Sequence, residues 1–216
     1  LVAILASCTQ QVDKPNLIYL LADQHRADVL GFRGDGKAIT PNLDRMADNG
    51  MVFENAVSVS PVCAPHRSSL FTGKYISSTG MVINEVCMNP NHRAIGYVLH
   101  DAGYDMAYLG KWHLVDIHGR NIPQGPARLG FQYASLFQAY NFNHQNYRGF
   151  YWTDEGDSVV MKKIDGNQTE YWTSTAIEYI RNAANIVGQL HATGKKGKMP
   201  GQLHVTGKKG KMPGQL

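Results

Sequence analysis

The chain has 216 residues, 43% of them hydrophobic, so that residues 15–185 are long enough and apolar enough to bury one domain core. Its formal charge of +4 comes from the C-terminal tail: without the six lysines of residues 186–216, the 21 basic residues fall to 15, against 17 acidic ones. The domain itself is slightly acidic, so its charge gives no reason to expect nucleic-acid binding.

The first eight residues read LVAILASC and end at Cys8. This apolar segment resembles the end of a bacterial lipoprotein signal peptide, in which Cys8 is the residue that becomes acylated. It is too short to span a membrane as a helix. We therefore expect a bacterial lipoprotein, exported to the periplasm or cell surface, with residues 1–14 as the remnant of signal and tether and a lipid anchor on Cys8. The alternative is a buried N-terminal strand with Cys8 in the core.

Residues 16–22 form a short, nearly continuous apolar run, which predicts a strand buried on both faces. Asp23 and Gln24 follow this run directly. Ligands of open α/β sheets bind beyond the carboxyl ends of the strands, so Asp23 stands where a metal-binding carboxylate is useful. Considered alone, Asp23 is better explained as a turn or capping residue.

Residues 40–50 carry the signals of a helix: Thr40 as N-cap, a proline in the first turn and a glycine at the end. Residues 51–53 and 56–59 then predict strands that lead into the next turn.

Residues 63–73 read CAPHRSSLFTG. Pro65 suits the first turn of a helix because its missing N–H has no partner there. Cys63 is then at or just before a helix N-terminus, where unpaired N–H groups and the helix dipole favour negative charge. Arg67, one turn further on, offers a planar, permanently charged group that binds oxyanions.

Residues 94–103 predict an amphipathic helix closed by a glycine, and residues 104–109 predict a strand. The strand leads into Gly110-Lys111-Trp112-His113. A histidine titrates near neutrality and can accept a proton. Taken alone, Lys111 is an ordinary solvated charge and His113 an ordinary surface or core histidine.

Together these patterns resemble the sulfatase family. That family has a Cys-x-Pro-x-Arg motif that ends in Thr-Gly, a first strand that ends in Asp-Asp or Asp-Gln, a Thr-Pro-Asn-Leu-Asp helix and a Gly-Lys-x-His motif. The resemblance covers residues 15–185, the N-terminal part of the family's catalytic domain. It implies an α/β fold with an alkaline-phosphatase-like mixed sheet flanked by helices, here incomplete and followed by an irregular basic tail.

The resemblance also implies chemistry for the first group of residues. Cys63 is oxidised to formylglycine (3-oxoalanine) by a formylglycine-generating enzyme. Asp23, with Gln24 and the modified residue 63, binds a divalent cation, usually Ca²⁺, and oxygen ligands suit such a hard cation.

For the second group, the resemblance implies that Arg67 and Lys111 contact sulfate oxygens and that His113 takes a proton from the formylglycine hydrate. The implied activity is hydrolysis of sulfate esters, with sulfated carbohydrate as the expected substrate. Two alternatives stay open: a phosphonate or phosphate monoester hydrolase of the same fold, and a truncated, non-catalytic protein that binds sulfated glycans.

Other segments carry weaker signals. Residues 125–131 look family-like, and residues 140–152 are aromatic-rich and predict a loop that covers the core. His144 and Tyr147 within that loop receive no role. Cys87 is expected to be a free thiol, because three cysteines with these spacings form neither a disulfide framework nor a zinc site.

Residues 169–185 predict a capped helix. Residues 188–200 and 201–213 then repeat one 13-residue sequence with a single change, and two such copies cannot bury a core. The tail, residues 186–216, is either a polybasic arm or the product of a frameshift or aberrant fusion. His191 and His204 in the repeats match no family motif. The resemblance implies that the remaining metal ligands, a histidine that protonates the leaving alcohol and a further sulfate-binding lysine belong to a later part of the family's catalytic domain. We therefore expect the chain alone to bind metal poorly and to be weakly active or inactive.

Overall fold

The structure is a computed structural model that describes residues 14–115, 121–138, 142–143 and 148–193. The chain divides into two compact units, one of residues 1–56 and one of residues 57–216.

In the first unit, residues 16–22 do not form the predicted strand. The large apolar side chains from Leu17 to Leu21 are 38–74% exposed. A strand needs neighbours that take its backbone N–H and C=O groups, and the described residues of this unit contain no other strand to provide them. The predictions of strands at residues 51–53 and 56–59 are also wrong, and Met51, Phe53 and Val57 are likewise exposed.

The helix predicted at residues 40–50 is confirmed as α1, Pro41–Asn49. Its N-cap residue does not cap it by a side-chain hydrogen bond. Thr40 Oγ1 instead accepts the first backbone N–H of the short helix η1, Gly31–Arg33, at 2.8 Å, and donates to Asp44 Oδ1 at 2.8 Å. Thr40 therefore ties η1 to α1.

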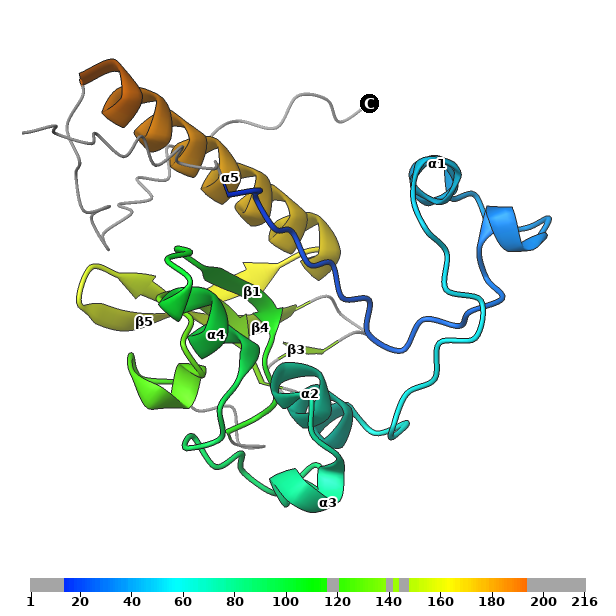
Figure 1. The fold of residues 1–216 in the computed structure, drawn as a ribbon, viewed down its shortest axis with the longest axis horizontal. Helices are drawn as coiled ribbons and strands as arrows, with labels where there is room; N and C mark the ends of the chain where they lie inside the picture. The colour runs from blue at the N-terminus through cyan, green and yellow to red at the C-terminus, as the bar shows by residue number, and fades with distance from the viewer. Residues whose placement is uncertain (1–13, 116–120, 139–141, 144–147, 194–216) are drawn as a thin grey trace, which may run out of the picture. The chain divides into compact units, whose positions relative to one another are not determined.

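The second unit is built on a mixed five-stranded sheet (Figure 1). Strands β1 and β2 are parallel, β2 and β3 each pair with β4 antiparallel, and β5 pairs antiparallel with β4 along its whole length. The mixed sheet of the predicted fold class is confirmed. The strands are β1 Ala107–Lys111, β2 Tyr133–Phe137, β3 Phe142–Asn143, β4 Arg148–Glu155 and β5 Ser158–Asp165.

Two strands differ from their predicted limits. β1 begins three residues later than residue 104 and runs to Lys111, so the strand ends inside the Gly-Lys-x-His motif. β4 occupies part of the segment that was predicted as a loop, residues 140–152. Its three consecutive aromatic residues favour a strand once β5 is available as a partner, and a two-residue turn at residues 156–157 supplies that partner.

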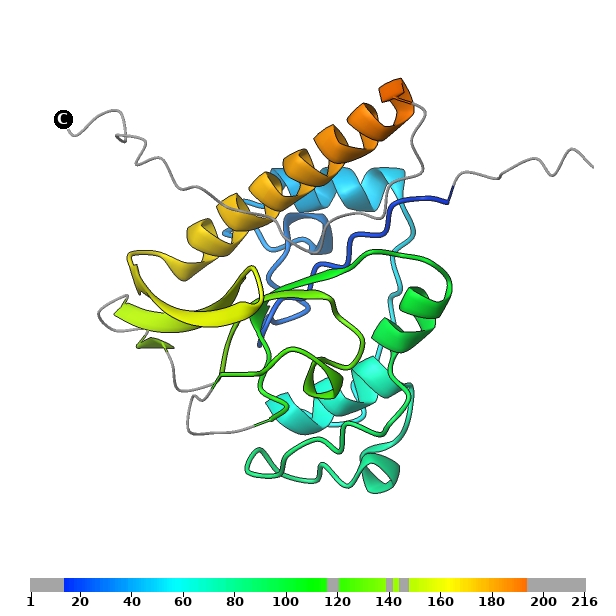
Figure 2. The same ribbon diagram turned by 90° about the vertical axis from the view of Figure 1, so that its left-hand side faces the viewer.

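Helices cover both faces of the sheet (Figures 1 and 2). The helices α2, Cys63–Thr72, α3, Ile76–Thr79, and α4, Ile95–Asp101, lie towards one face, and α4 confirms the helix predicted at residues 94–103. The long helix α5, Gln168–Thr193, lies along the other face. The short helix η2, Pro126–Arg128, precedes β2.

Alternating side chains of β2 separate two cores. Leu136 belongs to the core under α2, where Phe71 lies 5.4 Å from Trp112 between ring centroids. The next residue, Phe137, faces α5 and stacks on Trp172 at 5.7 Å. Because successive residues of a strand point to opposite faces, this pattern places α2 and α5 on opposite sides of β2.

Helix α5 is longer than predicted. It was expected to end at residue 185, but it runs to Thr193 and so includes the start of the first repeat. A single glycine inside a helix costs only about 1 kcal/mol, so Gly188 does not end it. None of the helices described here has the length and apolarity that a membrane crossing requires.

The tyrosines between the sheet and α5 predict the behaviour of the fold at high pH. Burial raises the pKa of Tyr179 to about 12, and Asp105 adds to the rise. Burial also raises the pKa of Tyr151 and of Tyr133. The folded state therefore holds these phenol protons more tightly than the unfolded state, which contributes stability below pH 10 that is lost as the pH rises towards 12.

We expect the free energy of unfolding, measured by urea denaturation, to fall between pH 10 and 12 with a slope that Tyr179→Phe reduces. Tyr75→Phe is the control, because Tyr75 is 74% exposed, and it should leave the slope unchanged. An equal effect of the two substitutions would contradict the burial of Tyr179 against the sheet.

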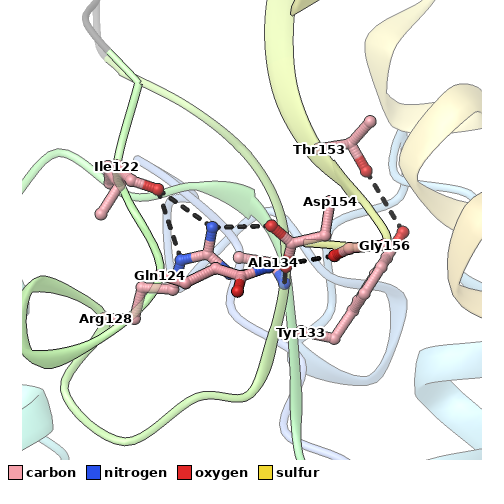
Figure 3. Close-up of polar contacts among 8 residues, drawn as sticks. All are labelled: Ile122, Gln124, Arg128, Tyr133, Ala134, Thr153, Asp154 and Gly156. Atoms are coloured by element: carbon pink, nitrogen blue, oxygen red, sulfur yellow. Dashed lines mark hydrogen bonds and ion pairs between the residues drawn. The ribbon is translucent and has the colours of Figure 1, made fainter. Parts of the chain in front are cut away.

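A buried ion pair joins η2 to the centre of the sheet (Figure 3). Arg128 donates to both carboxylate oxygens of Asp154 on β4, at 2.5 and 2.7 Å, and to the Ile122 carbonyl oxygen at 3.0 and 3.3 Å. Asp154 Oδ2 also accepts the backbone N–H of Ala134 at 3.0 Å. The two charged side chains are 2% and 6% exposed. This cluster closes the segment between β1 and β2 onto the sheet.

Candidate active site

The N-terminus of α2 presents Cys63 as its first helical residue. Val62 is extended and serves as N-cap, and its carbonyl oxygen accepts the His66 N–H at 2.9 Å. Pro65 lies in the first turn, as predicted, and Gly73 ends the helix in the left-handed conformation that glycine adopts readily. The Cys63 side chain is half-buried, and its position at the positive end of α2 suits an anion.

A distant side chain caps this helix. Asn84 Oδ1 accepts the backbone N–H of Ala64 at 3.0 Å, although Asn84 lies 20 residues further along the chain. Without such an acceptor the first N–H groups of a helix have no partner inside the helix. Asn84 therefore holds the helix turn that carries Cys63. No local sequence pattern predicts this capping contact.

Arg67 links α2 to the end of β1. Its guanidinium is buried, at 4% exposure of the residue, and Nη1 donates to the Lys111 carbonyl oxygen at 2.7 Å and to the Tyr108 hydroxyl at 3.1 Å. The Tyr108 hydroxyl in turn donates to the same Lys111 carbonyl oxygen. Gly110, inside β1 between these two residues, has a φ of 109°. A backbone conformation that side chains rarely adopt explains why glycine precedes Lys111.

Lys111 reaches Cys63 from the end of β1. Its Nζ lies 3.4 Å from the Cys63 Sγ. The parallel ladder with β2, in which Lys111 pairs with Phe137, fixes where this side chain begins. The fold thus gathers three of the predicted site residues, Cys63, Arg67 and Lys111, from two segments more than 40 residues apart. The Lys111 ammonium beside a helix N-terminus is suited to an anion, and Arg67 adds a second positive charge on the same helix.

His113 follows Lys111 by two residues and is 3% exposed. Its backbone is left-handed, with a φ of 55°, and its N–H donates to Gln138 Oε1 at 3.0 Å. His113 follows the last residue of β1, Lys111, by only two residues, so the short backbone segment between them links the imidazole to the lysine.

Asp23 and Gln24 lie in the first unit, beyond the apolar run, and both are exposed. Gln24 is left-handed, with a φ of 36°. Within the part of the chain that the structure describes, no three side chains of the His, Cys, Asp or Glu types gather as a metal-binding cluster. Asp23 is the one predicted carboxylate ligand, and Gln24 offers an amide oxygen next to it.

Other predicted residues fall elsewhere. Cys87 is a free, exposed thiol, as predicted, and it donates to the Val115 carbonyl oxygen. Cys8, His144, Tyr147 and His204 lie outside the described residues.

Three polar residues of the site were not predicted from the sequence: Asn84, Tyr108 and Gln138. A polar residue that directly follows the apolar β2 strand was a usable signal for Gln138. Tyr108 and Asn84 gave none, because their partners are decided by the register of β1 against β2 and by the packing of α2.

Comparison with known proteins identifies a family to which the chain is similar. Residues 15–188 match the protein family described as Sulfatase. An ulvan-active sulfatase of Formosa agariphila is 42% identical over 136 residues, which are 62% of this chain and 26% of that protein.

Solved structures agree with the sequence match. yidJ of Bacteroides fragilis superposes with a TM-score of 0.71 at 30% identity, over 81% of this chain and 42% of that one. A protein solved in complex with its substrate D-glucosamine-2-N,6-O-disulfate superposes with a TM-score of 0.64 at 28% identity, over 79% of this chain and 32% of that one. The chain thus spans about a quarter to two-fifths of the length of these three proteins.

Proposed function

The chain belongs to the sulfatase family, and on that premise we propose that it hydrolyses sulfate esters of carbohydrates, with Cys63 as the residue that is converted to formylglycine. The observation that carries the proposal is the approach of Lys111 Nζ to 3.4 Å from the Cys63 Sγ, with the buried Arg67 guanidinium on the same helix. A cation this close to the nucleophilic position is placed to hold an anionic ester group.

Formylglycine at residue 63 would supply, as its hydrate, the hydroxyl nucleophile that displaces the alcohol from the sulfate ester by cleavage of the S–O bond. The sulfate oxygens gain negative charge as the alcohol leaves. Lys111 and Arg67 stabilise that charge, and because Arg67 is held by Tyr108 and the Lys111 carbonyl, it needs little reorganisation during the reaction. His113 would accept the proton of the second hydroxyl, as an imidazole nitrogen can.

We further propose that Asp23 and Gln24 contribute oxygen ligands to a divalent cation, taken to be Ca²⁺, together with residue 63. Carboxylate and amide oxygens are the donors that such a cation prefers. Its chemical contribution when bound is to polarise oxygens at the reacting sulfur. The roles of Lys111, Arg67 and His113 above do not depend on this cation.

Partners and location follow the same proposal. The conversion of Cys63 requires a formylglycine-generating enzyme. The solved relative that is bound to a glucosamine disulfate supports a sulfated carbohydrate as the substrate class. The lipobox-like ending at Cys8 supports an exported lipoprotein that is attached to a bacterial membrane through this residue.

The test is production of the full chain together with a formylglycine-generating enzyme, followed by peptide mass mapping of residue 63 and rate measurements on an aryl sulfate and an aryl phosphate. We expect the thiol to be replaced by the aldehyde, and sulfate to be the preferred substrate. Cys63→Ala is the control and should abolish turnover.

Three outcomes would contradict the proposal. Full activity with an intact thiol would exclude the formylglycine route. Faster phosphate hydrolysis would favour a phosphate or phosphonate monoesterase of the same fold. Retained binding of a sulfated glycan without turnover would favour a non-catalytic protein.

A further inference from the structure

His113 has a backbone conformation that histidine seldom adopts. Its φ of 55° lies in the left-handed region, where an L-residue brings its Cβ close to the following carbonyl oxygen. Such outliers persist only where surrounding contacts hold them, and they concentrate at functional sites. The contacts that hold His113 therefore bear on how its imidazole is aimed.

Residues 111–113, where the chain leaves β1, form hydrogen bonds with the end of β2. Lys111 is the last residue of β1 in register with Phe137. The next residue continues the ladder, since Trp112 N–H donates to the Phe137 carbonyl oxygen at 2.8 Å. At His113 the ladder ends, and the N–H donates to the side-chain Oε1 of Gln138 at 3.0 Å. A side chain thus replaces the strand backbone where the left-handed turn begins.

The bond lies in the interior. His113 is 3% exposed and Gln138 is fully buried. A buried N–H without an acceptor is costly, so removal of Oε1 would drive the His113 backbone to find another partner or another conformation. An extended backbone at His113 would turn its Cα–Cβ bond, and the imidazole with it, away from the present direction.

We propose that Gln138 is a positioning residue, whose Oε1 holds the His113 N–H and so keeps the left-handed backbone that sets the direction of the imidazole, two residues after Lys111. The assignment deepens the proposed sulfatase function and rests on it for the role of the imidazole. The claim that Gln138 holds the His113 backbone can be tested whether or not the chain hydrolyses sulfate esters.

The chain offers a control. Gln132 Oε1 accepts the Met106 N–H at 3.0 Å, which is the same kind of bond at the opposite end of the β1–β2 pair, although Gln132 is exposed and Gln138 is buried. Gln138→Leu and Gln132→Leu each remove one amide acceptor with little change in side-chain volume. The first should disturb His113, and the second should not.

The experiment uses the full chain labelled with ¹³C,¹⁵N-histidine. In Gln138→Leu we expect the His113 amide to exchange with solvent at least about tenfold faster and its Cα and Cβ shifts to leave the left-handed range. In Gln132→Leu both readouts should stay at their wild-type values. Unchanged exchange and shifts of His113 in Gln138→Leu would overturn the assignment, whatever the activity.

Kinetics test the functional part. In Gln138→Leu, kcat on an aryl sulfate should fall about 10- to 100-fold with KM changed much less, because a displaced catalytic group slows the chemical step more than binding. If the NMR changes occur but the wild-type chain shows no turnover, the positioning role stands and the proposed function fails. An NMR change without any loss of kcat would overturn the link between Gln138 and catalysis.

If Gln138→Leu folds poorly, the same substitution can be compared in wild-type protein and in a His113→Gly variant. Glycine tolerates a positive φ without support, so His113→Gly removes the conformational cost that Gln138 offsets. The drop in Tm caused by Gln138→Leu should therefore be smaller in the His113→Gly background. An equal drop in both backgrounds would make Gln138 an ordinary core residue.

Discussion

Replacing Asp154 with asparagine should lower the free energy of unfolding by about 3–5 kcal/mol, because it leaves the buried Arg128 guanidinium without its counter-charge. Arg128 and Asp154 are held by two direct hydrogen bonds, and both side chains are almost fully buried. Urea denaturation followed by circular dichroism measures the loss.

An exposed ion pair provides the control. Arg93 and Asp101 are joined at 2.9 Å, but their side chains are 66% and 59% exposed, so Asp101→Asn should cost less than about 1 kcal/mol. The double substitution Arg128→Met with Asp154→Leu should cost less than the two single substitutions combined, because it leaves no unpaired charge. A loss at Asp154 no larger than that at Asp101 would mean that the pair is hydrated in solution.

Replacing Lys111 with methionine should lower kcat/KM on an aryl sulfate by about 10²–10³-fold, the usual effect of removing one group that stabilises developing charge. Methionine keeps most of the apolar stem, so the loss isolates the ammonium that lies 3.4 Å from the Cys63 Sγ. Steady-state rates and the inhibition constant of inorganic sulfate measure the change, and sulfate inhibition should weaken as well.

Lys74→Met is the control for net charge. Lys74 is exposed just after the end of α2, and its loss removes the same charge without touching the site. Its kcat/KM should stay close to wild type. If both substitutions lower the rate equally, general electrostatic attraction of the substrate explains the effect and Lys111 has no specific role.

Helices were predictable from the sequence where their signals are local. A proline in the first turn and a glycine after the last residue identified α1 and α2 closely, and the closing glycine after α4 did the same. The α/β class with a mixed sheet was predictable as well, and solved sulfatases share it. The structure of the apolar run, residues 16–22, was not predictable. A buried strand and an exposed apolar segment have the same composition and differ only in whether neighbouring strands pair with them.

The sequence by itself identified the candidate site residues: Cys63, Arg67, Lys111 and His113 stand at motif spacings that depend on no contact. The tertiary structure alone decided how they are held. The β1–β2 register brings Lys111 to Cys63, the Tyr108 hydroxyl and the Lys111 carbonyl oxygen fix Arg67, and Gln138 fixes His113. The physical reason is that these bonds join residues 25–48 positions apart, whose meeting is set by sheet pairing and helix packing rather than by any local preference of the chain.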